Sequence, residues 1–113
     1  MYVRCAVFEG EVAPSDQKNF DAHVAEKVLP ILAAFPKIRS ARVLRAQSVE
    51  DDGPPIYQVF ELQFDDEADM RAALASPNRA RSRAAVAEVM GLFKGRVYHV
   101  NHRLSARPGQ SDV

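Results

Sequence analysis

The residues of this 113-residue chain that could transfer a proton near neutral pH are its three histidines. An imidazole has an ordinary pKa near ~6.5, so it can act as a general base or a general acid in this range. His23 falls in a stretch with helical periodicity and could reach a cleft beneath that helix. His99 and His102 fall in a predicted strand, where a spacing of three residues places them on opposite faces. We therefore expect His23 or His99 to be the proton shuttle, with His99 preferred to His102 because it lies further inside its strand.

Polar side chains on the other predicted strands could orient a substrate or form a buried pair. Tyr57 could donate a phenolic hydrogen bond to a substrate carbonyl, and Arg42 could bind an acidic or enolate group. Glu61 could line a pocket as an acid with a perturbed pKa, or it could form a structural ion pair with Arg4. The structural ion pair is the favoured interpretation for Glu61, and side chains such as Tyr57 and Arg42 are more often packed in a subunit interface.

Other catalytic signatures are missing from the sequence. The single cysteine, Cys5, lies in a predicted central strand, where a buried thiol behaves as a small apolar residue. The sequence contains no zinc-ligand spacing, no glycine-rich phosphate loop and no Gly-x-Ser-x-Gly elbow. The arginines of one helical stretch are interpreted as a solvated face: Arg71, Arg79, Arg81 and Arg83. We expect neither a metal ion nor a cofactor.

The overall charge excludes two classes of partner. Lys and Arg total 15 and Asp and Glu total 15, so the formal net charge is zero. Proteins that bind nucleic acid or an anionic membrane show a basic surplus, which this chain lacks. No apolar run approaches the ~20 residues that span a bilayer, and the start does not resemble a signal peptide. We expect a cytoplasmic protein.

The elements that must position these residues follow from hydrophobic periodicity. Strands are predicted over 2–8, 39–49, 56–64 and 96–103, and helices over 15–35 and, in two segments, over 66–75 and 77–94. Pro30 should kink or tighten the first helix near Ala25 and Glu26, because proline lacks an N–H. Gly95 is predicted to end the last helix. Residues 1–104 are expected to form one domain, and residues 105–113 a disordered tail.

The order β-α-β-β-α-β is the ferredoxin-like pattern, an α+β fold. It places four antiparallel strands in the order 4-1-3-2, with both helices on one face. On the open face we expect alternate residues of the third strand, namely Tyr57, Val59, Glu61 and Gln63. The first strand would present either the set that contains Arg4 or the set that contains Cys5. Because an exposed apolar face of this size usually marks an interface, we expect a homodimer that packs sheet against sheet.

The chain resembles the EthD-like family. The resemblance covers residues 2 to about 103 and is carried by FDAHVAEKVLPILAAFPKIRSARV (20–43) and DDEADMRAALASPNRARSRA (65–84). The family belongs to the dimeric α/β-barrel superfamily, so the resemblance implies a dimeric α/β barrel. The superfamily includes small monooxygenases, lactone isomerases, polyketide cyclases, haem-degrading enzymes and stress proteins.

Two functions are consistent with these observations. The first is an EthD-like enzyme that acts on a hydrophobic carbonyl or phenolic metabolite by proton transfer, cyclisation or cofactor-free oxygenation. Its pocket would lie between sheet and helices, with His23 or His99 as proton shuttle. The other residues expected at the site are Phe20, Arg42, Tyr57, Phe60, Glu61, Leu62 and Phe93. The alternative is a non-catalytic protein of the same fold that binds a small hydrophobic molecule.

Overall fold

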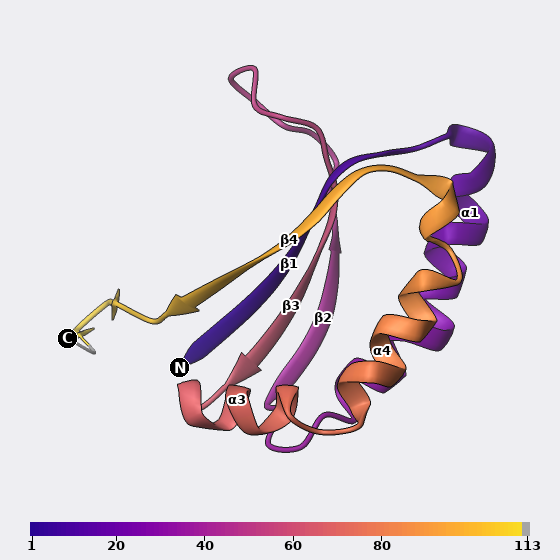
Figure 1. Ribbon diagram of the computed structural model, residues 1–113. Coiled ribbons are helices and arrows are strands. Elements are labelled where there is room, and N and C mark those ends of the chain that lie inside the picture. The colour runs from indigo at the N-terminus through magenta and orange to yellow at the C-terminus, as the bar shows by residue number, and fades with distance from the viewer. Residues whose placement is uncertain (112–113) are drawn as a thin grey trace.

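A four-stranded sheet with all of its long helices on one face makes up most of the structure (Figure 1). The computed structural model describes residues 1–111. In chain order the elements are β1 (Tyr2–Val12), α1 (Pro14–His23), η1 (Val24–Val28), α2 (Leu29–Ala33), β2 (Ser40–Arg45), β3 (Ile56–Phe64), α3 (Glu67–Leu74), α4 (Asn78–Ala87), η2 (Met90–Leu92), β4 (Phe93–Arg103), β5 (Ala106–Arg107) and β6 (Gln110–Ser111).

The sheet has the strand order β2-β3-β1-β4, and all of its neighbouring strands are antiparallel. This order confirms the ferredoxin-like prediction, with β1 and β3 in the centre. The bounds of β3 coincide with those predicted from its alternating pattern. Strand β2 is shorter than predicted, because its pairing with β3 ends at Arg45.

The paired strands β1 and β4 are longer than predicted because two glycines let them pass closely. Gly10 faces Gly95 across the ladder, and both have positive φ angles, 150° and 153°. A Cβ on Gly10 would lie 2.1 Å from the backbone oxygen of Lys94. The prediction that Gly95 ends a helix was therefore wrong: Gly95 lies within β4, where only a residue without a side chain fits.

The first helix is interrupted where the proline was expected to disturb it. Pro30 has no N–H to donate, and the turn before it, η1, is a π-helical turn rather than an α-helical one. The helix nevertheless continues through α2, so Val28 and Leu32 remain buried against the sheet. The apolar stripe predicted from the sequence therefore survives the irregularity.

The two segments of the second helical region begin in different ways. Asp66 caps α3, because its carboxylate accepts a hydrogen bond from the backbone N–H of Asp69 at 2.9 Å. Helix α4 starts after Pro77 and has no side-chain cap. The Asn78 side chain instead donates to the backbone oxygen of Ala34 at 2.7 Å, which ties the start of α4 to the end of α2.

The pairing register decides which residues face the helices. Ala6, Phe8 and Phe60 are buried beneath the helices, so Val3, Cys5 and Val7 of β1 point to the open face. Val59, Glu61 and Gln63 share that face, as predicted.

The prediction that Tyr57 also lies on the open face was wrong. The register between β1 and β3 shifts between Phe8 and Glu9, and Tyr57 is buried on the helix side.

Within the expected tail, β5 and β6 pair as a short hairpin, while residues 112–113 lie outside the described residues. In residues 1–111, no helix is both long and apolar enough to cross a membrane.

Candidate functional site

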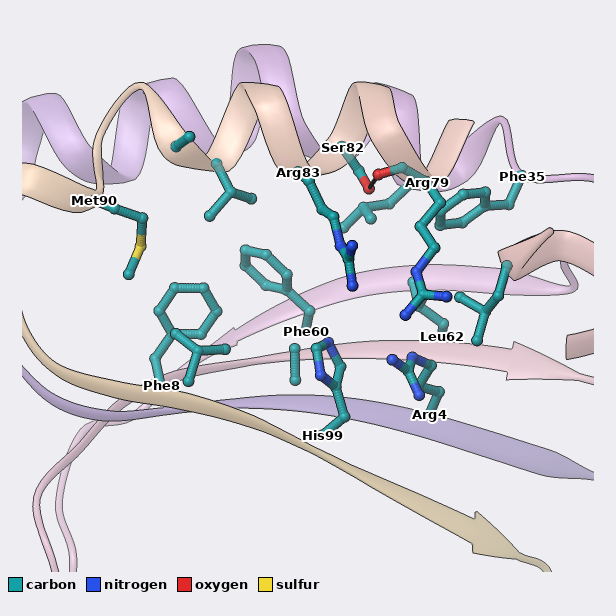
Figure 2. Close-up of a pocket in the computed structure, with 16 residues that line it drawn as sticks. Arg4, Phe8, Phe35, Phe60, Leu62, Arg79, Ser82, Arg83, Met90 and His99 are labelled. Atoms are coloured by element: carbon teal, nitrogen blue, oxygen red, sulfur yellow. Dashed lines mark hydrogen bonds between the residues drawn. The ribbon is translucent and has the colours of Figure 1, made fainter. Parts of the chain in front are cut away.

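A cavity of about 290 Å³ lies between the sheet and helix α4 (Figure 2). Its volume is near the lower end of the ~300–1,000 Å³ range of small-molecule pockets. The side chains around it are mostly apolar, with three arginines, a serine and a histidine among them. They are Arg4, Ala6, Phe8, Leu32, Phe35, Phe60, Leu62, Leu74, Arg79, Ser82, Arg83, Val86, Ala87, Met90, Val97 and His99.

Simple periodicities place these side chains at the cavity. Alternate residues of β1 and β3 supply its floor, and Phe8 packs against Phe60 with ring centroids 4.8 Å apart. Residues three and four apart on α4 supply its roof, because they share one face of a helix. Arg79 and Arg83 are such a pair, and they continue the apolar stripe that includes Val86.

Of the histidines in the described part of the chain, His99 lines the cavity, and it points from β4 toward α4 (Figure 2). Desolvation, followed by the positive charges of Arg4, Arg79 and Arg83, lowers the pKa of His99 below its ordinary value. The neutral imidazole therefore dominates at neutral pH, which is the form required of a general base. His102 points to the other face, where its Nδ1 lies 3.9 Å from Sγ of Cys5, as the spacing of the two histidines required.

Arg79 and Arg83 were not recognised from the sequence as site residues. The interpretation of the helix arginines as a solvated face is wrong for Arg79, which is partly buried and lines the cavity. Arg83 is exposed, as that interpretation required, but it also lines the cavity, whereas the exposed Arg81 does not. A signal was present in the spacing: Arg79, Arg83, Val86 and Met90 fall at intervals of four, three and four, so they lie on one helix face.

His23 connects two helices and does not line the cavity. Its Nε2 lies 2.6 Å from the backbone oxygen of Ala85 and 3.2 Å from a carboxylate oxygen of Glu88. Since Ala85 lies in α4 and Glu88 directly after it, these contacts hold α1 against α4.

Three residues expected at the site, Phe20, Tyr57 and Phe93, form an aromatic cluster in the core beside the cavity. The ring centroids of Phe20 and Tyr57 are 5.3 Å apart, and those of Tyr57 and Phe93 are 6.5 Å apart. The Tyr57 hydroxyl donates to the Asp21 carboxylate at 2.6 Å, and the Arg45 guanidinium lies 3.6 Å from the Tyr57 ring centroid. Burial, then the hydrogen bond to Asp21, raises the pKa of Tyr57 to about 12. None of the three aromatic residues lines the cavity.

Arg42 and Glu61 are brought together on the open face. An Arg42 guanidinium nitrogen lies 2.7 Å from Glu61 Oε1. Arg4 points to the helix side, so the pair between Arg4 and Glu61 considered from the sequence does not form. On the open face, burial and the negative charge of Glu61 raise the pKa of the Cys5 thiol. Of the expected site residues, the structure thus brings Phe60, Leu62 and His99 together at the cavity.

A second hollow lies between η1 and β2. Asp21, Arg45 and Gln58 are among the residues that line it. Gln58 is buried, and its Nε2 has no hydrogen-bond partner there. No group of three or more histidine, cysteine or acidic side chains gathers as metal ligands in the described part of the chain.

Comparison with known proteins identifies the fold. No protein-family model matches the sequence. An uncharacterised 11.0 kDa protein from Rhodococcus erythropolis, named for its position in the thcB–thcC intergenic region, is 28% identical over 74 residues. The match covers 66% of this chain and 72% of that protein.

Solved structures of similar fold cover nearly the whole chain. An ethyl tert-butyl ether D (EthD) family protein from Bacillus halodurans is 18% identical, with a TM-score of 0.67, over 91% of this chain and 98% of its own. A dimeric ferredoxin-like protein of unknown function from Thermobifida fusca is 17% identical, with a TM-score of 0.61, over 91% and 90% of the two chains. SnoaB, a cofactor-independent oxygenase from Streptomyces nogalater, is 17% identical, with a TM-score of 0.61, over 96% and 97%. At these identities the likeness shows the fold alone, so it confirms the ferredoxin-like fold predicted from the sequence, a fold that an EthD family protein shares.

Proposed function

We propose that this chain is a small-molecule enzyme that removes a proton from a hydrophobic carbonyl or phenolic substrate bound between the sheet and α4. The observation that carries the proposal is the position of His99 in an apolar cavity that also contains guanidinium groups, where desolvation and then these positive charges lower its pKa. Similar folds occur in an antibiotic biosynthesis monooxygenase and in a cofactor-independent oxygenase, which supports small-molecule chemistry in a cavity of this kind.

The proposed step uses His99 as the base. Its unprotonated ring nitrogen takes a proton from a carbon next to a carbonyl, or from a phenolic hydroxyl, and the electron pair of the broken bond remains on the substrate as an enolate or phenolate. The positive charges of Arg4, Arg79 and Arg83 stabilise this developing oxyanion. The same charges lower the pKa of His99, so one arrangement keeps the base neutral and stabilises the product anion. Proton removal is the first step shared by isomerisation, cyclisation and the oxygenation of activated substrates.

We assign no catalytic role to His23, because its contacts with Ala85 and Glu88 occupy it away from the cavity. Phe60 and Leu62 would contact the apolar part of the substrate. The aromatic cluster would support the cavity from the core; it consists of Phe20, Tyr57 and Phe93. Arg42 and Glu61 would form an ion pair on the open face and would not contact the substrate.

We also propose that the chain works as a homodimer in which two open faces pack together as a dimeric α/β barrel. The centre of this face carries apolar side chains, among them Val7, Val59 and the exposed Leu44. Ion pairs flank them: Arg42 with Glu61, and Arg96 with Glu9. Two proteins of similar fold are described as dimeric. A cytoplasmic location stays a prediction from the sequence.

The dimer is tested by replacing one apolar residue of this face with a charge. Val59→Lys should shift the sedimentation coefficient from that of a dimer to that of a monomer. Val49→Lys is the matched control, because Val49 is an exposed valine outside the sheet. A wild-type monomer at micromolar concentration would contradict the proposed assembly.

The chemistry is tested by hydrogen–deuterium exchange at carbon. Native mass spectrometry of protein taken directly from cells comes first, since a bound adduct would identify a natural ligand. The protein is then incubated in D₂O with ethyl benzoylacetate, a hydrophobic β-keto ester, and exchange at the carbon between the carbonyls is followed by NMR. His99→Gln should slow the catalysed exchange about a hundredfold, within the usual contribution of a general base, while His23→Gln should leave it nearly unchanged. Equal exchange with wild type and His99→Gln would contradict this role of His99.

A non-catalytic binding protein is the second candidate. One observation favours it: among the described residues, no hydrogen bond orients the His99 ring. An adduct in native mass spectrometry together with no catalysed exchange would support this alternative over the enzyme.

A further inference from the structure

Three guanidinium groups from two elements converge on one cavity. Arg79 and Arg83 reach down from α4, and Arg4 rises from β1 beside His99 (Figure 2). The α4 pair is fixed by the four-residue spacing of a helix, and Arg4 by its alternation with buried Ala6 and Phe8 on the strand.

These three arginines lack the acidic partners that other arginines of the chain have. Elsewhere, Arg39 pairs with Asp65, Arg71 with Glu67, and Arg96 with Glu9. Over the described residues, no carboxylate forms an ion pair with any of the cavity arginines.

Arg4 is the most constrained of the three. Its Nη1 donates to the neutral amide oxygen of Asn101 at 3.1 Å. Desolvation, followed by repulsion from Arg79 and Arg83, lowers the pKa of Arg4 from its ordinary value. Cations placed together beside apolar surface without a counter-charge are unfavourable, and a bound anion would relieve this.

The arrangement along the cavity orients such an anion. In Figure 2, Arg4 and Arg79 lie toward one end, and Phe8 and Met90 toward the other, with His99 between them. A carboxylate accepts two parallel hydrogen bonds from one guanidinium, so the arginine end is suited to its geometry. The apolar end would then take a ring or chain, and the intervening carbons would lie beside His99.

We propose that the ligand of this cavity is a hydrophobic organic anion, its acidic group bound by Arg4, Arg79 and Arg83 and its apolar body held between Phe8 and Met90. This inference rests on the proposed function and deepens it, because it names the charge and the orientation of the substrate. The acidic group is a permanent feature of the ligand, distinct from the oxyanion that forms during proton transfer.

The experiment compares two probes of nearly the same shape. The first, 2-naphthoate, carries a carboxylate, and the second, 2-acetylnaphthalene, carries a neutral acetyl group in its place. Binding of each to the full-length protein is measured by isothermal titration calorimetry at low and at high salt. We expect 2-naphthoate to bind at least tenfold more tightly than the ketone at low salt and to lose affinity at high salt.

Variants then locate the acidic group. Arg79→Gln and Arg83→Gln should each weaken 2-naphthoate about tenfold and change the ketone by less than twofold, because a charge-assisted hydrogen bond to the carboxylate is lost. Arg79→Lys should restore part of the lost affinity. Arg81→Gln is the matched control on the exposed side of the same helix and should change neither probe. Thermal melting of each variant confirms that it is folded.

The outcomes separate this inference from the proposed function. If both probes bind with the same affinity, or if Arg81→Gln weakens 2-naphthoate as much as Arg79→Gln does, the anion site is refuted while a small-molecule cavity remains. If neither probe binds, both proposals fail. Both proposals are supported if 2-naphthoate binds tightly to the wild type and if Arg79→Gln and Arg83→Gln weaken 2-naphthoate but leave the binding of the ketone unchanged.

Discussion

Replacing Gly10 with alanine should be among the most destabilising single substitutions in this chain. Gly10 and Gly95 oppose each other in the ladder between β1 and β4, where the two backbones leave no room for a Cβ. A Cβ at position 10 would lie 2.1 Å from the Lys94 oxygen and 2.8 Å from the Gly95 Cα. Both neighbours are backbone atoms, so the contact cannot be relieved by rotation of a side chain.

The size of the effect follows from two contributions. A non-glycine residue in a rarely populated backbone region costs of order 1–3 kcal/mol, and Gly10 has a φ of 150°. Forcing an extra methyl group into a packed contact costs typically ~1–3 kcal/mol more. The free energy of unfolding should therefore fall by about 4 kcal/mol, a large part of the ~5–15 kcal/mol typical of a native domain.

Urea unfolding followed by circular dichroism measures this change. With a slope of about 2 kcal/mol per molar urea, the midpoint should fall by about 2 M. Gly91→Ala is the matched control, because a Cβ there meets no atom within 4 Å, and its midpoint should change little. All variants are compared at one protein concentration, since dimerisation shifts apparent stability. If Gly10→Ala loses less than about 1 kcal/mol, the reasoning from this close contact is refuted.

Three further predictions concern titratable groups. The His99 ring should titrate below its ordinary pKa in an NMR titration, and Arg83→Gln should raise the pKa of His99. Because the unfolded chain binds a proton at His99 more readily than the folded chain does, the free energy of unfolding should be higher above pH ~6.5 and should fall as the pH drops through that value. Ultraviolet absorbance should show Tyr57 ionising near pH 12. The free energy of unfolding should decline between pH ~10 and that value, because the unfolded state loses its phenolic proton first. Tyr57→Phe should remove this late absorbance transition. Cys5 should react with a disulfide reagent more slowly in the folded protein than in urea at pH 8, because its thiol pKa is raised; equal rates would contradict this.

Local sequence patterns predicted the structure correctly wherever the deciding interaction lies within one helix or strand. The alternation over 56–64 predicted both ends of β3. Pro30 marked the irregular turn of the first helix, because a missing N–H acts on the helix that contains it. The order of strands and helices was enough to predict the ferredoxin-like sheet.

The cavity could be predicted only in part, because its lining residues come from three strands, β1, β3 and β4, and from several helical segments that lie far apart in the chain. The two-residue period of a strand established from sequence that His99 and His102 lie on opposite faces, but not which face lies beneath the helices. The register of β4 against β1 decides this, and it places His99 opposite buried Ala6. Sequence periodicity contains no information about that register.

The two largest differences between the sequence-based expectations and the structure have the same cause. Tyr57 was expected on the open face, and a register shift beside Phe8 turned it into the core, where it reaches Asp21. Helical spacing placed Arg79 and Arg83 on one side of α4, but packing decided that this side covers the cavity. The sequence by itself thus determined which residues share a face of an element, because that depends on backbone geometry within the element. The tertiary structure alone decided which faces meet, because this depends on contacts between segments far apart in the chain.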